Sequence, residues 1–244
     1  MKNEWFASWF DTSYYHILYK NRDDNEAQDF MDELLRFLNP SATDKIMDLA
    51  CGKGRHAIYL NEKGYRVTGV DLSPESISHA SQFENDRLNF DVHDMRKVYQ
   101  KDSFEYLFNL FTSFGYFENE SENIDAIKSF AATLKPGGTL VIDFMNADKV
   151  VKNLVAHEIK TVDHIEFHIS RRVENGFIVK DIRFEDEGKA FHFTEKVKAI
   201  SQSDFIGYLQ HAGLTLVKTA GNYNLEDFNA DTADRLILIA KKPL

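Results

Sequence analysis

From residue 45 onward, apolar residues recur with two spacings that alternate along the chain. Short apolar runs are typical of buried strands, and apolar residues three or four positions apart are typical of one face of a helix. The run FEYLFNLF is apolar on both faces, as expected of a central parallel strand. The alternation predicts a doubly wound, Rossmann-like α/β fold with a mostly parallel sheet. Strands are expected at 45–50, 65–73, 87–95, 104–111 and 139–145, and helices at 54–64, from Pro74, and at 121–134.

The N-terminal forty residues are predicted to be helical. In the segment 23–38, six apolar residues fall on one stripe, and Asn39-Pro40 ends the helix. Such a stripe usually packs on a core, and a lid over a cleft is the alternative. We expect an N-terminal helical cap over residues 1–40. The stripe consists of Ala27, Phe30, Met31, Leu34, Leu35 and Leu38.

A different pattern begins near residue 157. Ile165, Phe167 and Ile169 alternate with polar residues, which marks a half-buried antiparallel strand. Two further strands follow between turn signals, so a small antiparallel sheet is expected after the fifth core strand. The loop between the two closing strands is too short for a crossover helix, so the last strand is expected to be antiparallel. The expected division is a cap at 1–40, a Rossmann-like core at 41–150, a β insertion serving as a substrate lid at 151–200, and the end of the core at 201–244.

Composition narrows the range of partners. The chain has 244 residues and a formal net charge of −10, which disfavours nucleic acid and anionic membranes as partners unless a local basic patch opposes it. Cys51 is the single cysteine, so no intrachain disulfide or four-cysteine zinc site is possible. The N-terminal sequence contains neither a basic leader nor a long apolar run, so we expect a cytoplasmic protein without a membrane span.

A histidine-rich strand in the insertion raises the question of a metal. His164, Glu166 and His168 share one strand face, and His192 is placed on a neighbouring strand. Polar residues on the wet face of a half-buried strand need no metal, so no metal site is predicted.

A glycine-rich loop follows the first core strand. Gly52, Gly54 and Ala57 fit the dinucleotide-binding pattern G-x-G-x-x-G/A, and Asp71 ends the next strand about 20 residues on. Glycines let the backbone approach a ligand closely, and a carboxylate at that strand tip can accept hydrogen bonds from both ribose hydroxyls. An adenosine-containing cofactor is therefore expected, either a nicotinamide dinucleotide or S-adenosylmethionine.

Three features favour S-adenosylmethionine. Asp48 lies just before the loop, where its carboxylate would repel a pyrophosphate and attract an ammonium group. Asp94 follows the third strand, where it could accept the adenine amino group while Met95 packs on the ring; Asp91 is the alternative. The expected antiparallel last strand is the third feature.

Residues 46–144 resemble a class I S-adenosylmethionine-dependent methyltransferase. The motifs, in order, are MDLACGKG, VDLS, DVHDM, FNLFTSFGYF and LKPGGTLVIDF. The resemblance is strongest to bacterial small-molecule enzymes with an N-terminal helical cap and a β insertion. It implies that Tyr15, Tyr19 and Arg22 lie near the cofactor, with Arg22 pairing with its carboxylate. Ala50 is a small departure, because many members have glycine there. The expected cofactor-binding residues are Tyr15, Tyr19, Arg22, Asp48, Ala50, Cys51, Gly52, Gly54, Asp71, Leu72, Asp94, Met95, Asn109 and Leu110.

The resemblance implies in-line transfer of a methyl group to a small or medium organic acceptor, with S-adenosylhomocysteine as product. Phe111, Phe114 and Tyr116 follow a strand end and are expected to wall the substrate pocket. No catalytic residue is assigned, because Tyr116, Glu118, His56 or a histidine of the insertion could each serve as base. The alternatives are an NAD(P)-dependent oxidoreductase, a non-catalytic S-adenosylmethionine-binding module and an RNA methyltransferase.

Overall fold

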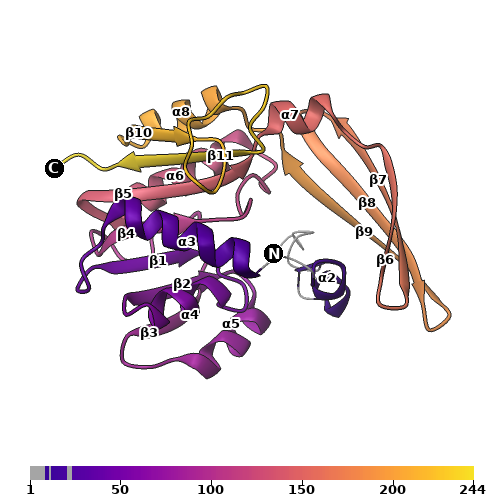
Figure 1. The fold of residues 1–244 in the computed structure, drawn as a ribbon, viewed down its shortest axis with the longest axis horizontal. Coiled ribbons are helices and arrows are strands. Elements are labelled where there is room, and N and C mark those ends of the chain that lie inside the picture. The colour runs from indigo at the N-terminus through magenta and orange to yellow at the C-terminus, as the bar shows by residue number, and fades with distance from the viewer. Residues whose placement is uncertain (1–8, 11, 21–23) are drawn as a thin grey trace.

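The computed structural model describes residues 9, 10, 12–20 and 24–244. Its core is a seven-stranded sheet with the order β10-β11-β5-β4-β1-β2-β3 (Figure 1). Five strands run parallel, and β11 lies antiparallel between β5 and β10. The predicted Rossmann-like fold with an antiparallel last strand is therefore confirmed. The strands are β1 (Lys45–Leu49), β2 (Arg66–Asp71), β3 (Leu88–Val92), β4 (Phe104–Asn109), β5 (Leu134–Met145), β10 (Thr215–Ala220) and β11 (Arg235–Lys241).

Helices cover both faces of this sheet, because each face presents its own apolar cluster. On one face, α3 (Asp24–Leu38), α4 (Arg55–Glu62) and α5 (Pro74–Ala80) contribute buried residues to one cluster. On the other, α6 (Glu120–Thr133) and α8 (Gln202–His211) contribute to the second. The apolar stripe of α3 thus packs on the core, with Phe30 and Leu34 fully buried.

Local signals fix several element ends. Ser73 caps α5 by accepting the Ser76 N–H at 3.0 Å, and Pro74 occupies the first helical position. Asn119 and Glu122 form a capping box at the start of α6. β5 begins five residues before the expected 139, because KPGG is carried into the sheet with a register shift opposite Phe104.

A four-stranded antiparallel sheet with the order β6-β7-β8-β9 follows β5 and the short helix α7 (Ala147–Lys152). This confirms the predicted insertion and adds β6, which the sequence pattern did not distinguish as a separate strand. The inner face of this sheet packs on Trp9 and on Leu18 of α2 (Ser13–Leu18), so α2 lies between the insertion and the core (Figure 1). The strands are β6 (His157–Val162), β7 (Ile165–Glu174), β8 (Phe177–Asp186) and β9 (Lys189–Lys198). Among the described residues, no helix combines the length and apolar composition that crossing a membrane requires.

Gly69 in β2 provides a test of the packing beneath the site. A Cβ there would lie 2.6 Å from the Phe90 ring and 2.9 Å from Cys51 Sγ. We expect Gly69→Ala to destabilise the protein by about 1–3 kcal/mol, because a close-packed core resists added volume. Urea denaturation measures the change. Gly207→Ala in α8 is the matched control: nothing lies within 4 Å of its added Cβ, and alanine should stabilise the helix by roughly 0.5–1 kcal/mol. Equal behaviour of the two variants would contradict the packing argument.

Candidate functional site

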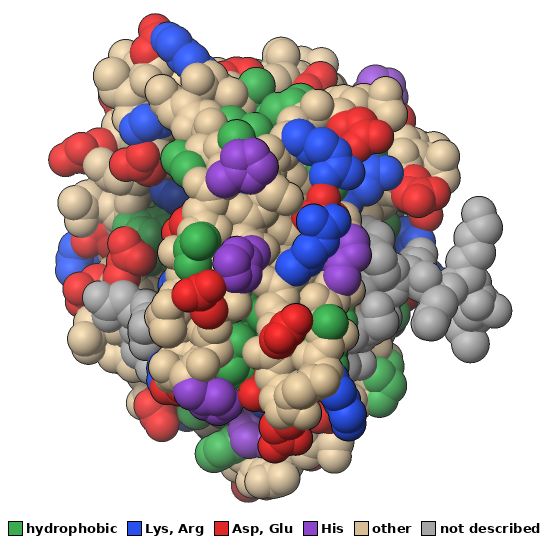
Figure 2. Space-filling model, turned by 90° about the vertical axis from the view of Figure 1, so that its right-hand side faces the viewer, with side chains coloured by type: hydrophobic (Ala, Val, Ile, Leu, Met, Phe, Trp, Pro, Cys, Tyr) green, Lys and Arg blue, Asp and Glu red, His purple; other side chains and the backbone are tan. Residues whose placement is uncertain are grey.

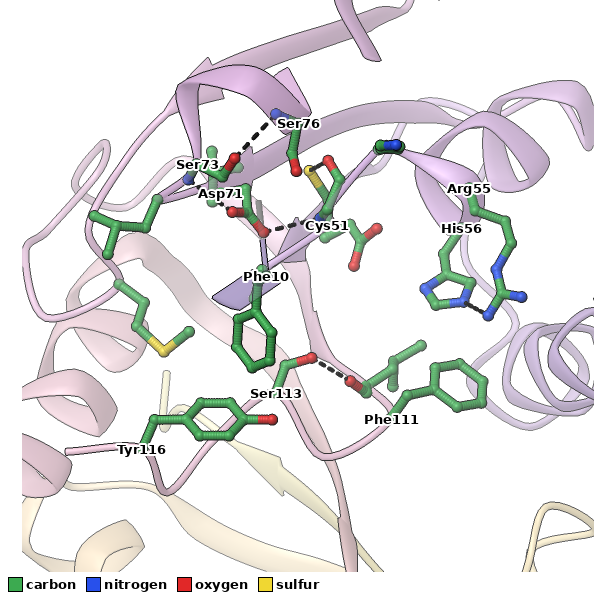
Figure 3. A pocket seen from close by; sticks show the side chains of 18 of the residues that line it. Phe10, Cys51, Arg55, His56, Asp71, Ser73, Ser76, Phe111, Ser113 and Tyr116 are labelled. Carbon is green, nitrogen blue, oxygen red and sulfur yellow. Dashed lines mark hydrogen bonds between the residues drawn. The ribbon is translucent and has the colours of Figure 1, made fainter. Parts of the chain in front are cut away.

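A cavity of about 340 Å³ opens beyond the carboxyl ends of β1, β2 and β4 (Figure 3). Parallel α/β sheets bind ligands at this edge, where neighbouring strand ends bring their loops together. The cavity brings together thirteen of the residues expected from the sequence: Tyr15, Tyr19, Asp48, Ala50, Cys51, Gly52, Asp71, Leu72, Asp94, Met95, Leu110, Phe111 and Tyr116.

The loop between β1 and α4 turns sharply by using positive φ angles. Ala50 has φ 60°, Gly52 φ 54° and Gly54 φ 84°. Gly54 does not line the cavity: it faces the Phe90 ring, which a Cβ would approach to 2.7 Å. The Cys51 N–H donates to the Val70 carbonyl at 3.0 Å, which ties the loop to β2. The glycine pattern therefore combines exposed backbone with close packing beneath it.

Asp71, at the end of β2, holds the loop in place (Figure 3). One carboxylate oxygen accepts the Gly52 N–H at 2.9 Å, and the other accepts the Ser73 N–H at 2.8 Å. A carboxylate has about four acceptor positions, so these two hydrogen bonds alone do not exhaust it, and Asp71 borders the cavity.

Asp48 is a nearly fully buried carboxylate that borders the same cavity, at 2% exposure. Its Oδ2 has no hydrogen-bond partner among the described residues. Burial, with the nearby charge of Asp71, raises the pKa of Asp48 to about 7, although the Ala57 N–H and Arg55 act in the opposite direction. An orphaned buried carboxylate oxygen beside a cavity is suited to a cationic ligand group.

Asp94 and Met95 line the cavity next to Asp71, whereas Asp91 does not. The Asp91 carboxylate instead accepts a hydrogen bond from the Tyr99 hydroxyl. Arg96 grips Asp94 with a forked contact, Nε to Oδ1 at 2.9 Å and Nη2 to Oδ2 at 2.8 Å. Burial acts to raise the pKa of Asp94, but Arg96 outweighs it and the pKa is lowered.

The loop after β4 is strained. Phe111 has φ 56° and Thr112 φ 60°, although neither is glycine. Such angles cost on the order of 1–3 kcal/mol for each residue, and a β-branched threonine is an outlier there. The strain persists because surrounding residues hold the loop. Asp143 accepts the Phe111 N–H at 2.8 Å, and Arg235 donates to the Thr112 hydroxyl at 3.0 Å.

Two residues expected at the site from this segment do not line the cavity. Asn109 is fully buried, and its amide donates to the Leu49 carbonyl at 3.1 Å, so it links the ends of β4 and β1. Phe114 is fully buried against Phe130 and Phe205. Both therefore support the strand ends from behind. Arg22 lies outside the described residues.

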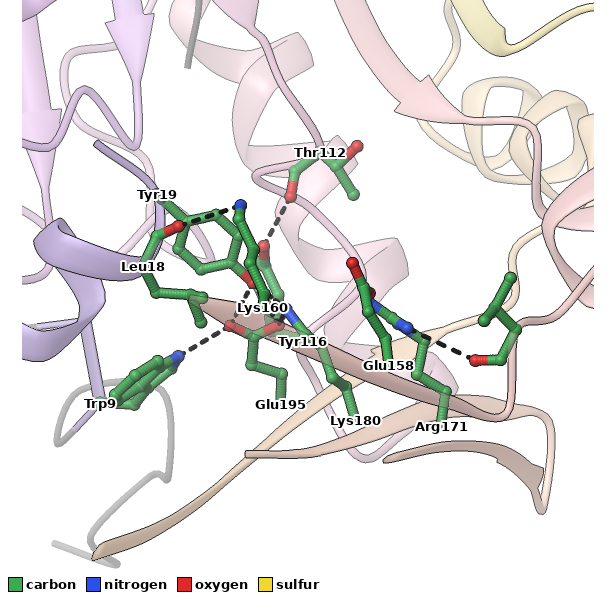
Figure 4. A network of polar contacts seen from close by, with 11 residues as sticks. Trp9, Leu18, Tyr19, Thr112, Tyr116, Glu158, Lys160, Arg171, Lys180 and Glu195 are labelled. Carbon is green, nitrogen blue, oxygen red and sulfur yellow. Dashed lines mark hydrogen bonds and ion pairs between the residues drawn. The ribbon is translucent and has the colours of Figure 1, made fainter. Parts of the chain in front are cut away.

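A polar network ties the cavity wall to the insertion (Figure 4). The Tyr19 hydroxyl, next to α2, donates to both oxygens of Glu195 in β9, at 2.7 and 2.9 Å. The Trp9 indole N–H donates to the same carboxylate at 2.8 Å, and Lys180 Nζ lies 3.3 Å from it. Burial lowers the pKa of Lys180, and Glu195 acts against that shift. The wall contributed by α2 is thus positioned from the insertion.

Among the proposed bases, His56 and Tyr116 line the cavity and Glu118 does not. The His56 ring stacks on Phe111 at 4.6 Å between centroids and lies 3.0 Å from Arg55 Nη2. The Tyr116 hydroxyl donates to the Thr112 carbonyl at 2.6 Å. These two side chains come from opposite sides of the cavity (Figure 3).

The insertion histidines lie away from this cavity, on the outer face of the second sheet, where Figure 2 shows histidine among acidic and basic side chains. His164 pairs with Asp186 at 3.1 Å, and His192 pairs with Asp181 at 3.1 Å. They are therefore not positioned to act as a base. In the part of the chain that the structure describes, no group of three His, Cys, Asp or Glu is suited to a metal ion.

Several lining residues fell outside the expected set. Most flank a motif residue directly, as Ser73 flanks Asp71 and Arg96 follows Asp94, so adjacency to the motifs was a usable signal. Phe10, His16 and Lys20 of the N-terminal segment had no comparable signal, although their neighbours Tyr15 and Tyr19 were expected from the resemblance. The additional residues are Phe10, His16, Lys20, Lys53, Arg55, His56, Val70, Ser73, Ser76, His93, Arg96, Ser113 and Phe117.

The doubly wound sheet and its acidic crevice define a Rossmann-like, nucleoside-binding class of fold. Residues 46–138 match the family described as "Methyltransferase domain". A solved S-adenosylmethionine-dependent methyltransferase from Clostridium acetobutylicum ATCC 824 has the same fold, with a TM-score of 0.78, 23% identity, and coverage of 95% of this chain and 96% of that one. Over residues 46–138 the chain thus matches a methyltransferase domain, and its fold is that of a solved S-adenosylmethionine-dependent methyltransferase.

Two curated relatives are similar over the core. The dTDP-3-amino-3,4,6-trideoxy-alpha-D-glucopyranose N,N-dimethyltransferase of Streptomyces venezuelae is 30% identical over 131 residues, 53% of this chain and 54% of that protein. Glycine N-methyltransferase of Rattus norvegicus is 30% identical over 134 residues, 48% of this chain and 46% of that protein. The chain spans about half the length of these relatives.

The buried Asp48 carboxylate predicts a pH-dependent stability. Because its pKa rises from 3.8 to about 7 on folding, its ionisation destabilises the fold progressively as the pH rises from about 4 to 7. That shift sets an upper bound on the order of 4 kcal/mol. We expect Asp48→Asn to gain free energy of unfolding relative to wild type between pH 5 and 7, with the difference level above pH 7. Urea denaturation of the ligand-free proteins measures it, and a pH-independent difference would contradict the assignment.

Proposed function

We propose that the protein transfers a methyl group from S-adenosylmethionine to a small or medium organic acceptor, leaving S-adenosylhomocysteine. The observation that carries the proposal is the convergence of three carboxylates, Asp48, Asp71 and Asp94, on one cavity, with one Asp48 oxygen unpartnered among the described residues. The match to a methyltransferase domain supplies the cofactor class, and the fit of these residues supports it.

Each part of the cofactor has a suitable neighbour. The remaining acceptor capacity of Asp71 suits the two ribose hydroxyls, and Gly52 leaves backbone open beside them. Asp48 suits the ammonium of the methionine moiety, since its unpaired oxygen would gain a charged donor. Asp94 and Met95 suit the adenine, although the Arg96 fork leaves Asp94 fewer free acceptor positions.

The same charges argue against a nicotinamide dinucleotide. Its pyrophosphate would lie by the glycine loop, where Asp48 and Asp71 would repel it. Titration with S-adenosylmethionine and with NAD(P) separates the two classes, and binding of the dinucleotide alone would overturn the proposal.

The acceptor side of the cavity is aromatic, with Phe10, Tyr15, Phe111 and Tyr116 in its wall. When bound, the cofactor supplies a methyl group on a positively charged sulfur with a neutral leaving group. The side chains have then to align a nucleophile, exclude water and, for a protonated acceptor, take up a proton. His56 has the side chain suited to that last task, and the Tyr116 hydroxyl, which donates to the Thr112 carbonyl, can accept a hydrogen bond from the acceptor.

Both curated relatives are named as enzymes that methylate nitrogen. Primary and secondary amines are therefore the first acceptors to screen. A net charge of −10 keeps RNA a poor alternative, and a cofactor-binding module without turnover would be shown by binding with no product in any screen. The cytoplasmic location and the lid role of the insertion stay predictions.

Replacing Asp71 by alanine should weaken S-adenosylmethionine binding. The substitution removes the proposed ribose acceptors and releases the Gly52 N–H. We expect a loss of at least about 2 kcal/mol, or roughly 30-fold in Kd, measured by calorimetry. Asp91→Ala is the matched control, an aspartate on the next strand that does not line the cavity. Unchanged affinity in Asp71→Ala would remove this residue from the site.

Cofactor affinity should also depend on pH through Asp48. Below its pKa of about 7 the carboxylate is protonated and offers no charge to the ammonium. We expect S-adenosylmethionine affinity to rise by up to about tenfold per pH unit between pH 5.5 and 7 and then to level off, with proton release on binding. Asp48→Asn should bind more weakly at pH 7.5 and show no such rise. Parallel pH profiles for the two proteins would refute the ammonium contact.

A further inference from the structure

A buried ion pair lies behind the cavity wall and outside the cavity itself. Asp143 in β5 is fully buried, and its Oδ1 accepts Arg235 Nε from β11 at 2.8 Å. Neither residue lines the cavity. The Arg235 guanidinium also lies over the Tyr223 ring at 5.6 Å. The pair therefore joins β5 to β11 through two residues that are 92 positions apart in sequence.

Asp143 and Arg235 also contact the two strained residues of the loop after β4. Asp143 Oδ2 accepts the Phe111 N–H at 2.8 Å, and the Asp143 carbonyl accepts the Thr112 N–H at 3.0 Å. Arg235 Nη2 donates to the Thr112 hydroxyl at 3.0 Å. These contacts act on the two consecutive residues that have positive φ. The ion pair thus supports a backbone shape that neither residue adopts readily.

That backbone shape orients two groups at the cavity. Phe111 stacks against His56 on its cavity side, with Phe30 and Tyr223 at 6.0 and 5.6 Å on other sides. The Thr112 carbonyl accepts the Tyr116 hydroxyl. Of these two groups, the His56 imidazole can take up a proton from the acceptor, and the Tyr116 hydroxyl oxygen can accept a hydrogen bond from it. One ion pair therefore acts, through one loop, on both of them.

We propose that Asp143 and Arg235 are positioning residues for methyl transfer, which hold the Phe111–Thr112 turn so that His56 and Tyr116 face the acceptor. The inference rests on the proposed function. The pair itself contacts neither cofactor nor acceptor in this proposal. It acts on the acceptor side of the cavity, whereas on the cofactor side Asp71 and Gly52 are held by other contacts.

Arg235→Lys is the informative substitution, because it keeps the charge opposite Asp143 but loses the fork that also reaches Thr112. We expect turnover with an amine acceptor to fall by roughly 10- to 100-fold, as misplacement of reacting groups does, with little change in S-adenosylmethionine affinity. Adding Thr112→Gly should restore part of the loss, because glycine adopts positive φ without the clamp. Arg87→Lys, at a partly buried arginine that is bonded to the Gly64 carbonyl and does not line the cavity, is the matched control and should match wild type in turnover.

A second readout needs no acceptor. In nuclear magnetic resonance spectra of the ligand-free protein, the Phe111 ring should shift the His56 ring protons, which are assigned by their loss in His56→Gln. This ring-current shift of the His56 protons should shrink in Arg235→Lys and recover when Thr112→Gly is added. It should stay unchanged in Arg87→Lys.

The two readouts distinguish failure of the function from failure of the inference. If no acceptor yields product, the proposed function fails, while the His56 resonance still tests whether the pair sets the turn. If the His56 ring protons of Arg235→Lys resonate at the same position as in wild type, the inference is overturned. A parallel loss of cofactor affinity and turnover that Thr112→Gly does not relieve would also overturn it, because that pattern indicates a general structural role.

Discussion

Two carboxylates, Asp48 and Asp71, are held beside one cavity, and this electrostatic constraint organises the site. Each is kept there by backbone: Asp48 by its place in a buried strand and the Ala57 N–H, Asp71 by the N–H groups of Gly52 and Ser73. Burial is the largest cause of the raised pKa of Asp48, Arg55 and the Ala57 N–H offset only part of the shift, and the repulsion from Asp71 adds to it. A ligand with a positive charge and several hydroxyl donors would relieve that repulsion, and a polyphosphate would not.

Local sequence signals were sufficient where the site is built from contiguous chain. The strand–turn–helix from β1 to α4 brings Asp48 and Gly52 to the cavity, and the end of β2 brings Asp71 there, because each signal lies within a few residues of the feature it marks. The antiparallel β11 followed from the loop between the two closing strands, which is too short for a crossover helix. β6 was missed because its residues are mostly exposed and give little alternation.

Features that depend on distant contacts could not be read from the sequence. Nothing in the pattern shows that Phe111 and Thr112 adopt positive φ, since that shape is imposed by Asp143 and Arg235 from other strands. After the Phe111–Thr112 turn, the Phe114 side chain lies in the core and not in the cavity. The Arg96 fork on Asp94 likewise depends on tertiary geometry.

The network around Glu195 has a consequence for how acceptor preference can change in such a protein. Trp9 and Tyr19 from the N-terminal part share the largely buried Glu195 carboxylate of the insertion with Lys180. A transplanted insertion without that carboxylate would leave the Trp9 indole N–H and the Tyr19 hydroxyl without this acceptor, and α2 would lose the contacts that hold it on the insertion. The N-terminal segment and the β insertion are thus coupled and should be exchanged together. Grafts that keep both partners of this network preserve the cavity wall that α2 contributes.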